Sequence, residues 1–247
     1  MNTLDPLADI LDKVILITGA SGGIGYACAK KLAEAGARHL ILTGRDASRL
    51  NTVAASLNTM GAGRVDVCVC DQSRREDLER LFEFLENSAW PDVLIANVGI
   101  NPVHEYGPKK LHNLRFEQLE QAITTNITHT CYLVVHVLRQ MRARRFGRLV
   151  LMGSRAWQFG IPGQALYNLS KSSLVGLKNS IVGEYGSAGV YCHLLNPGVV
   201  LNARTERLRR QRDGAELQGV TEEQVACVVL DLLAIADVAQ NGQEMCI

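Results

Sequence analysis

The sequence lacks the features that membrane, secreted or nucleic-acid-binding proteins need. No apolar run approaches the roughly 20 residues that span a bilayer. Segment 1–13 contains acidic residues and no long apolar core, unlike a secretory signal. The net charge is only +1, which gives no reason to expect a nucleic acid or an anionic membrane as partner. We therefore expect a cytoplasmic protein without membrane or nucleic-acid partners.

The cysteines show no disulfide pattern. The chain has seven of them, an odd number, at scattered spacings. Cys68 and Cys70 lie in an apparent strand, and we do not expect them to share a metal ion. The sequence therefore predicts free thiols in a reducing compartment and no metal site.

What the sequence does contain is a regular alternation of short apolar segments and longer helical patterns. The predicted strands are 14–17, 39–43, 64–70, 92–96, 148–152, 190–195 and 244–247. The predicted helices are about 23–36, 46–60, 74–88, 114–143, 164–187 and 222–235, with a long loop at 97–113 and an irregular stretch at 198–220. This order predicts an α/β fold: one Rossmann-type doubly wound parallel sheet of about seven strands with helices on both faces. We expect residues 1–247 to form a single domain.

The first predicted strand leads into a glycine-rich turn. At such a strand-to-helix turn, bare backbone N–H groups and the positive end of the helix dipole suit a diphosphate. Glycine lets the backbone approach the phosphates and adopt positive φ angles. A purely structural turn is the alternative, since glycine-rich turns also close helices and hairpins. The residues of this candidate site are Gly19, Ser21, Gly22, Gly23, Ile24 and Gly25.

Further candidates directly follow other predicted strands. Ligands of a doubly wound sheet bind beyond the carboxyl ends of its strands, so these residues are expected at one rim. They are Gly44, Arg45, Asp71, Gln72, Asn97, Gly99, Ser154, Asn196, Pro197 and Gly198.

Tyr167 and Lys171 form the one acid–base pair that the spacing suggests. They lie four residues apart near the start of a predicted helix, so both side chains share one face. A nearby ammonium stabilises a phenolate and lowers the pKa of the tyrosine. Ser154 could reach the same point and donate a hydrogen bond to a substrate oxygen. Such pairs also occur by chance on amphipathic helices, which keeps a structural interpretation open.

In combination, these motifs resemble the short-chain dehydrogenase/reductase family over nearly the whole chain, and most closely ketoreductases of the 3-oxoacyl-carrier-protein reductase type. The resemblance rests on TGASGGIG at 18–25, NVG at 97–99, Asn126 in TTNI, Ser154, YNLSK at 167–171 and NPG at 196–198. It implies an oxidoreductase that transfers a hydride between nicotinamide and a ketone or secondary alcohol, without a metal.

The resemblance also implies a role for each residue. Tyr167 would be the general acid or base, and Ser154 would orient the carbonyl. Lys171 would bind the nicotinamide ribose and lower the pKa of Tyr167, and Asn126 would hold a water in a proton relay. Cofactor contacts would come from the glycine-rich turn, Gly44, Arg45, Asp71, Gln72, Asn97, Gly99, Tyr167, Lys171, Pro197, Gly198 and Val200.

The second predicted strand indicates which nicotinamide cofactor binds. A carboxylate for the ribose 2′-hydroxyl is expected about 20 residues beyond the last glycine. Gly44 and Arg45 stand there instead, and a guanidinium suits a 2′-phosphate. We therefore expect NADP(H) rather than NAD(H). Against this, Gly22 stands where many NADP-linked relatives carry a basic residue, and Asp46 is close by.

The substrate is expected to be a small-molecule compound, a medium-sized organic ketone or alcohol. A plausible pocket wall consists of Val103, His104, Tyr106, Trp157, Phe159 and Ile161. An arginine cluster, Arg204, Arg207, Arg209, Arg210 and Arg212, falls where the family's substrate-covering loop lies. It suggests an anionic or carrier-linked substrate, although a solvated helical lid explains it equally well.

Two further points concern assembly and competing functions. The sequence ends where relatives continue into a tail used in subunit packing, so we expect a homodimer through the two long helices and leave a tetramer open. A non-catalytic NADP(H)-sensing protein that binds a partner is the main alternative. The complete set of Ser154, Tyr167 and Lys171 speaks against it. A sugar-nucleotide epimerase would need a further substrate domain.

Overall fold

The computed structural model describes residues 6–202, 205 and 218–247. Its centre is a parallel sheet with the strand order β3-β2-β1-β4-β5-β6-β9. The strands are β1 (Val14–Thr18), β2 (His39–Gly44), β3 (Arg64–Val69), β4 (Val93–Ala96), β5 (Gly147–Met152), β6 (Val190–Asn196) and β9 (Glu244–Cys246). The seven-stranded doubly wound sheet predicted from the apolar segments is thereby confirmed.

The strand order reverses between β1 and β4, and this position defines the site. β1 pairs with β2 on one side and with β4 on the other. When the chain leaves two neighbouring strands in opposite directions, a crevice opens beyond the carboxyl ends of those strands. The glycine-rich turn after β1 and the loop after β4 therefore face each other across it.

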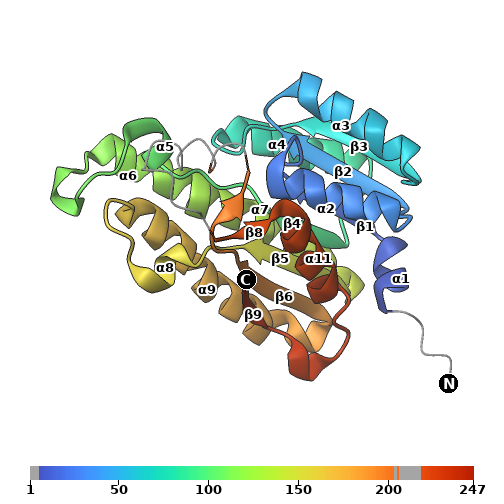
Figure 1. Ribbon diagram of the computed structural model, residues 1–247. Helices are drawn as coiled ribbons and strands as arrows, with labels where there is room; N and C mark the ends of the chain where they lie inside the picture. The colour runs from blue at the N-terminus through green and yellow to red at the C-terminus, as the bar shows by residue number, and fades with distance from the viewer. Residues whose placement is uncertain (1–5, 203–204, 206–217) are drawn as a thin grey trace.

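Helices cover both faces of the sheet (Figure 1). One face packs against α2 (Gly23–Glu34), α3 (Ala47–Thr59) and α11 (Glu222–Leu233). The other packs against α4 (Arg75–Asn87), α7 (His129–Arg144) and α9 (Ala165–Tyr185). Neighbouring residues of β1 contact both helix layers: Ile15 is fully buried in one layer and Leu16 in the other. Burial on both faces explains why the strands are continuously apolar.

Short helices gather at the left edge of the view in Figure 1, whereas α1 (Pro6–Leu11) lies at the opposite edge. They are α5 (Val103–Tyr106), α6 (Phe116–Ile123) and α8 (Ala156–Phe159). Short 3₁₀ turns cover Leu111–Asn113, Gly186–Ala188 and Val238–Gln240. A separate two-stranded parallel ladder joins β7 (Val200–Leu201) to β8 (Val220–Thr221).

Three expectations about local structure need correction. The helix predicted for 114–143 is interrupted, because a π-helical turn, Thr124–Thr128, separates α6 from α7. A π turn inserts a residue and redirects the side chains around it, which a regular apolar period cannot reveal. The loop predicted for 97–113 contains α5 and a 3₁₀ turn, and the stretch 198–220 contains β7.

Within the described ranges, no helix combines the length and apolarity needed to cross a membrane. All seven cysteines fall inside these ranges, and each is a free thiol.

Candidate active site

The glycine-rich turn brings α2 against the end of β1. Gly19 and Gly23 have φ angles of 67° and 58°, which side-chain-bearing residues rarely adopt. A Cβ atom on Gly25 would overlap the carbonyl oxygen of Gly19. Only glycine at position 25 therefore allows this close packing of helix and turn.

The same turn leaves donors for an anion. Gly22 is the N-cap residue of α2, and no side chain caps the helix. A Cβ on Gly22 would meet no described atom within 4 Å, so the backbone faces open space. Uncapped N–H groups and the helix dipole at such a spot bind phosphate. The chain's own residues thus fit the diphosphate of a dinucleotide.

Asn97 and Thr18 join the ends of β4 and β1 at the crevice. The Thr18 hydroxyl accepts hydrogen bonds from the backbone N–H groups of Asn97 (2.9 Å) and Val98 (3.2 Å). The side-chain amide of Asn97 donates to the Thr18 carbonyl at 3.0 Å. The Asn97 side chain therefore braces the two strands that form the floor of the crevice.

A positively charged side chain, that of Arg45, directly follows β2. Arg45 is exposed directly after Gly44, and a Cβ on Gly44 would lie 3.2 Å from the Ser21 hydroxyl. Asp46 accepts from the backbone N–H of Arg49 at 3.0 Å and pairs with its side chain at 3.3 Å. This carboxylate is thus engaged at the N-terminus of α3, beside an exposed guanidinium.

Ser154 is held in place by Asn196 at the end of β6. The fully buried Asn196 accepts from the backbone N–H of Ser154 at 3.0 Å and from the Trp157 indole at 3.3 Å. Its amide nitrogen donates to Glu244 at 2.9 Å. The Ser154 hydroxyl oxygen accepts from the backbone N–H of Ala156 at 3.2 Å, which leaves its hydrogen available to another acceptor.

Tyr167 and Lys171 lie one turn apart on α9, as their spacing predicts. The Lys171 ammonium is 5.7 Å from the centre of the Tyr167 ring and donates to the Met152 carbonyl at 2.7 Å. Burial lowers the pKa of Lys171 to about 8. Burial also raises the pKa of Tyr167, and hydrogen bonding with Ser154 opposes that rise.

The lowering of the Tyr167 pKa by Lys171 stays a prediction, and the causes of the Tyr167 shift in this structure are burial and Ser154. The ammonium is directed to a main-chain oxygen of β5, and removing the phenol from water favours its neutral form. Ser154 is the group that acts against this effect.

Asn126 and Gly99 complete the surroundings of Lys171. The Asn126 side chain bonds to the backbone of Ile100 and to the Ser170 hydroxyl. A Cβ on Gly99 would come within 2.9 Å of the Lys171 nitrogen and 3.7 Å of the Asn126 amide oxygen. The absence of a side chain at position 99 gives the lysine its space.

Other predicted contact residues have structural partners of their own. The buried Gln72 side chain donates to the hydroxyl of Thr130 on α7 at 3.0 Å. Asp71 accepts from the backbone N–H of Ser73 at 3.0 Å. Gly198 donates to the Ile247 carbonyl at 2.7 Å, the Pro197 carbonyl accepts from a backbone N–H at 3.0 Å, and Val200 begins β7.

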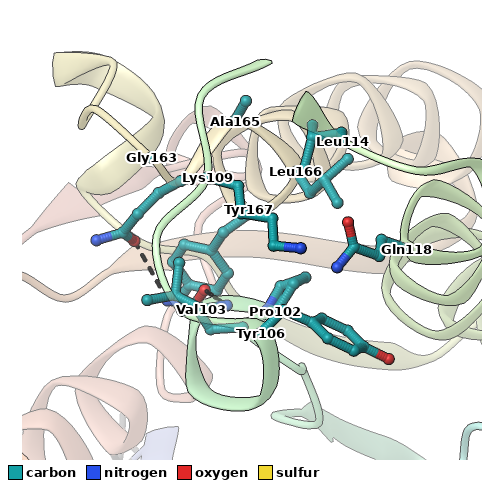
Figure 2. Close-up of a pocket in the computed structure, with 13 residues that line it drawn as sticks. Pro102, Val103, Tyr106, Lys109, Leu114, Gln118, Gly163, Ala165, Leu166 and Tyr167 are labelled. Carbon is teal, nitrogen blue, oxygen red and sulfur yellow. Dashed lines mark hydrogen bonds between the residues drawn. The ribbon is translucent and has the colours of Figure 1, made fainter. Parts of the chain in front are cut away.

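A pocket that is open to solvent, with about 280 Å³ of empty space when that solvent is included, lies beside Tyr167, between α5, α6 and the start of α9 (Figure 2). Val103 and Tyr106 line it, in agreement with the predicted wall. His104, Trp157, Phe159 and Ile161 do not. Trp157 is directed to Asn196 by its indole bond, and the Phe159 ring stacks with Arg155 at 5.2 Å and is largely exposed. The predicted substrate residue Arg204 lies outside the described residues, as do Arg207, Arg209, Arg210 and Arg212.

The sequence did not assign roles to three groups that organise this site: Thr18, Asn196 and the Met152 carbonyl. Asn196 carried a usable signal, because it directly follows the predicted strand 190–195. Nothing in the sequence indicated the hydrogen bond from Lys171 to a main-chain oxygen, since every residue carries a carbonyl.

Fold and site together define a dinucleotide-binding α/β protein with a Ser–Tyr–Lys constellation at the rim. The model of the short chain dehydrogenase family matches residues 13–213. The chain therefore belongs to the short-chain dehydrogenase family of NAD(P)-dependent oxidoreductases.

Individual relatives agree with this assignment. The chain is 30% identical over 209 residues to the 3-oxoacyl-[acyl-carrier-protein] reductase FabG of Haemophilus influenzae, covering 84% of this chain and 82% of the relative. It is 30% identical over 190 residues to mouse dehydrogenase/reductase SDR family member 4, covering 76% of this chain and 66% of the relative, or just under two thirds of its length.

Solved structures have the same fold. A protein assigned as an NAD(P) dependent gluconate 5-dehydrogenase from Beutenbergia cavernae, solved with NADP at low occupancy, superimposes with a TM-score of 0.85 at 26% identity, covering 95% of this chain and 94% of that one. The L-sorbose reductase of Gluconobacter frateurii has a TM-score of 0.85 at 21% identity, covering 96% and 95%.

Proposed function

We propose that this oxidoreductase uses NADP(H) to interconvert a small ketone and a secondary alcohol, with Tyr167, Ser154, Lys171 and Asn126 as its working residues. The observation that carries the proposal is the position of Tyr167, which lines a pocket while interacting with Ser154. The bound nicotinamide supplies or accepts the hydride.

Tyr167 transfers the proton. Its raised pKa keeps the phenol protonated at neutral pH, so it can donate a proton to the carbonyl oxygen during reduction. The Ser154 hydroxyl donates a hydrogen bond to the same oxygen, because its own oxygen already accepts from Ala156. The Lys171 ammonium adds positive charge beneath the phenol and binds the nicotinamide ribose. Asn126 holds the loop over Lys171 and a water that returns protons to it.

The experiment follows the absorbance of reduced nicotinamide with a panel of ketones. Tyr167→Phe should lower kcat by at least about 100-fold, the size of a general acid–base contribution. Ser154→Ala should also lower kcat, while the dissociation constant for the cofactor changes little. A Tyr167→Phe variant with unchanged kcat would overturn the proposal. Cofactor binding without turnover of any substrate would favour an NADP(H) sensor instead.

We further propose a preference for NADP(H) over NAD(H). Arg45 is exposed at the end of β2, and Asp46 is engaged with Arg49, which supports recognition of a 2′-phosphate. Fluorescence titrations with NADPH and NADH test this. Arg45→Glu should weaken NADPH binding by at least about 10-fold and leave NADH unchanged or bound more tightly. Equal dissociation constants in the unchanged protein would refute the preference.

We also propose that residues 1–247 form one domain that assembles as a homodimer in the cytoplasm. Apolar Val135 on α7 and Leu169 on α9 are 43% and 51% exposed, which supports a contact through these helices. Light scattering after gel filtration tests this, and Val135→Glu with Leu169→Glu should give a monomer. Proteolysis that releases a stable fragment would argue against one domain.

A further inference from the structure

Among the residues that the structure describes, one charged side chain lines the pocket beside Tyr167. Of the 13 residues that form it, Lys109 alone carries a charge and none is acidic. The remaining wall is largely apolar, with Pro102, Val103, Leu114 and Leu166. A single cation in an apolar pocket attracts an anion more strongly than it would on the open surface, because less water screens it.

The backbone holds Lys109 at this position. Its N–H donates to the Gly163 carbonyl at 3.2 Å and thereby joins the loop before α6 to the loop before α9. Gly163 has a φ of 80°, and a Cβ there would come within 2.7 Å of Pro108. In Figure 2 the Lys109 side chain extends across the pocket toward Gln118.

Gln118 provides a second, neutral donor. The residue is 2% exposed, and its amide nitrogen has no hydrogen-bond partner in the described parts of the chain. The amide orientation is determined, because the oxygen accepts from the backbone N–H of Arg115 at 3.2 Å. A buried donor without an acceptor is destabilising, so a native structure that keeps one calls for an explanation. Figure 2 shows this nitrogen directed into the pocket.

We propose that Lys109 and Gln118 bind the carboxylate of a small oxo acid or hydroxy acid whose carbonyl carbon lies at Tyr167. This inference rests on the proposed function and names its substrate class. The ammonium pairs with one carboxylate oxygen and the amide N–H with the other, while the apolar wall contacts the intervening carbons.

The test compares acetoacetate and levulinate with their methyl esters. Each pair has the same ketone, and the two acids differ by one methylene in the distance from ketone to carboxylate. kcat/KM is measured for the unchanged protein, for Lys109→Met, and for Lys110→Met as a control. Lys110 is the exposed neighbour and does not line the pocket.

We expect at least one acid to be preferred over its ester. Lys109→Met should lower kcat/KM for that acid by at least about 10-fold, equivalent to about 1.4 kcal/mol, and leave the ester unchanged. Lys110→Met should behave like the unchanged protein. An acid-to-ester ratio that is the same in all three proteins overturns the proposal.

Calorimetry separates this inference from the proposed function. Levulinate is titrated into each protein in the presence of NADP⁺, which cannot reduce a ketone. If no ketone is reduced in the first test, the proposed function fails. The titration still shows whether the pocket binds a carboxylate. Binding that Lys109→Met abolishes and Lys110→Met retains supports the carboxylate site, whereas no binding to the unchanged protein refutes it.

Discussion

The side chain of Asn126 pairs with the backbone of Ile100 in both directions. Its oxygen accepts from the Ile100 N–H at 2.8 Å, and its nitrogen donates to the Ile100 carbonyl at 2.8 Å. The same nitrogen donates to the Ser170 hydroxyl at 3.0 Å. Ser170 lies on α9 between Tyr167 and Lys171, so one amide connects the loop after β4, the π turn and the helix that carries the acid–base pair.

This arrangement makes Asn126→Asp informative. A carboxylate cannot donate to the Ile100 carbonyl or to Ser170, and it would place negative charge beside a carbonyl oxygen. We expect a loss of about 2 kcal/mol in the free energy of unfolding, measured with urea, and a lower kcat. Asn113→Asp, the same change on an exposed turn, serves as control. Equal stability of the two variants would contradict the bracing role of Asn126.

Gly25→Ala tests the close packing of the glycine-rich turn. The added Cβ would overlap the Gly19 carbonyl oxygen, so the turn must move away from α2. We expect cofactor affinity to fall by at least about 10-fold, together with a loss of stability of 1 kcal/mol or more, on the order of other overpacking changes. Gly183→Ala on the exposed face of α9 meets no described atom within 4 Å and should be neutral or slightly stabilising. Fluorescence titration and thermal unfolding measure both.

Lys171→Met should increase the stability of the protein while it abolishes activity. The pKa of Lys171 falls from about 10.5 to about 8 in the folded state, so folding at neutral pH includes the cost of burying its charge. Because the unfolded state binds the proton more tightly, stability should rise as pH increases from about 8 to about 10.5. The variant should lose both this pH dependence and its activity. Its free energy of unfolding at pH 7 should increase by about 1–2 kcal/mol, after allowing for the unpaired Met152 carbonyl.

Lys178→Met is the matched control for that change. Lys178 is also buried, but it donates to the Gly242 carbonyl at 2.9 Å and lies 4.0 Å from the Glu244 carboxylate. Removing it leaves both groups without this partner, so we expect destabilisation. Destabilisation by Lys171→Met of the same size would refute the argument about its buried charge.

Because of His193, we expect the stability of the folded protein to fall in acid. The residue is fully buried, neither ring nitrogen has a hydrogen-bond partner in the described structure, and burial together with Arg148 and Lys178 lowers its pKa to about 4. The unfolded state binds a proton below about pH 6.5, so the stability of the folded state falls as pH decreases from about 6.5 to about 4.

His193→Leu should remove that loss. We expect a flatter dependence of the unfolding free energy between pH 6.5 and 4, and unchanged or increased stability at pH 7 because a buried unpaired polar group is replaced. His112→Leu, on an exposed turn, should leave the pH dependence unchanged. If the two variants show the same acid profile, His193 is not the group responsible.

The order of strands and helices followed from local patterns. Ile15 and Ile17 belong to a continuously apolar segment because a parallel strand covered on both faces excludes polar side chains. The same approach was wrong at Thr124–Thr128, since the π turn is stabilised by contacts of Asn126 with Ile100 and Ser170. Those partners are 26 and 44 residues away along the chain, beyond the reach of any periodic pattern.

The sequence by itself determined the doubly wound sheet, the glycine-rich turn and the spacing of Tyr167 and Lys171, because apolar runs, glycine and helical periodicity act over a few neighbouring residues. Only the tertiary structure decided that Asn196 holds Ser154, that Lys171 donates to Met152, and that Lys109 and Gln118 line one pocket. Such relations depend on burial and on segments that meet after folding, and burial sets the pKa values of the phenol and the amine.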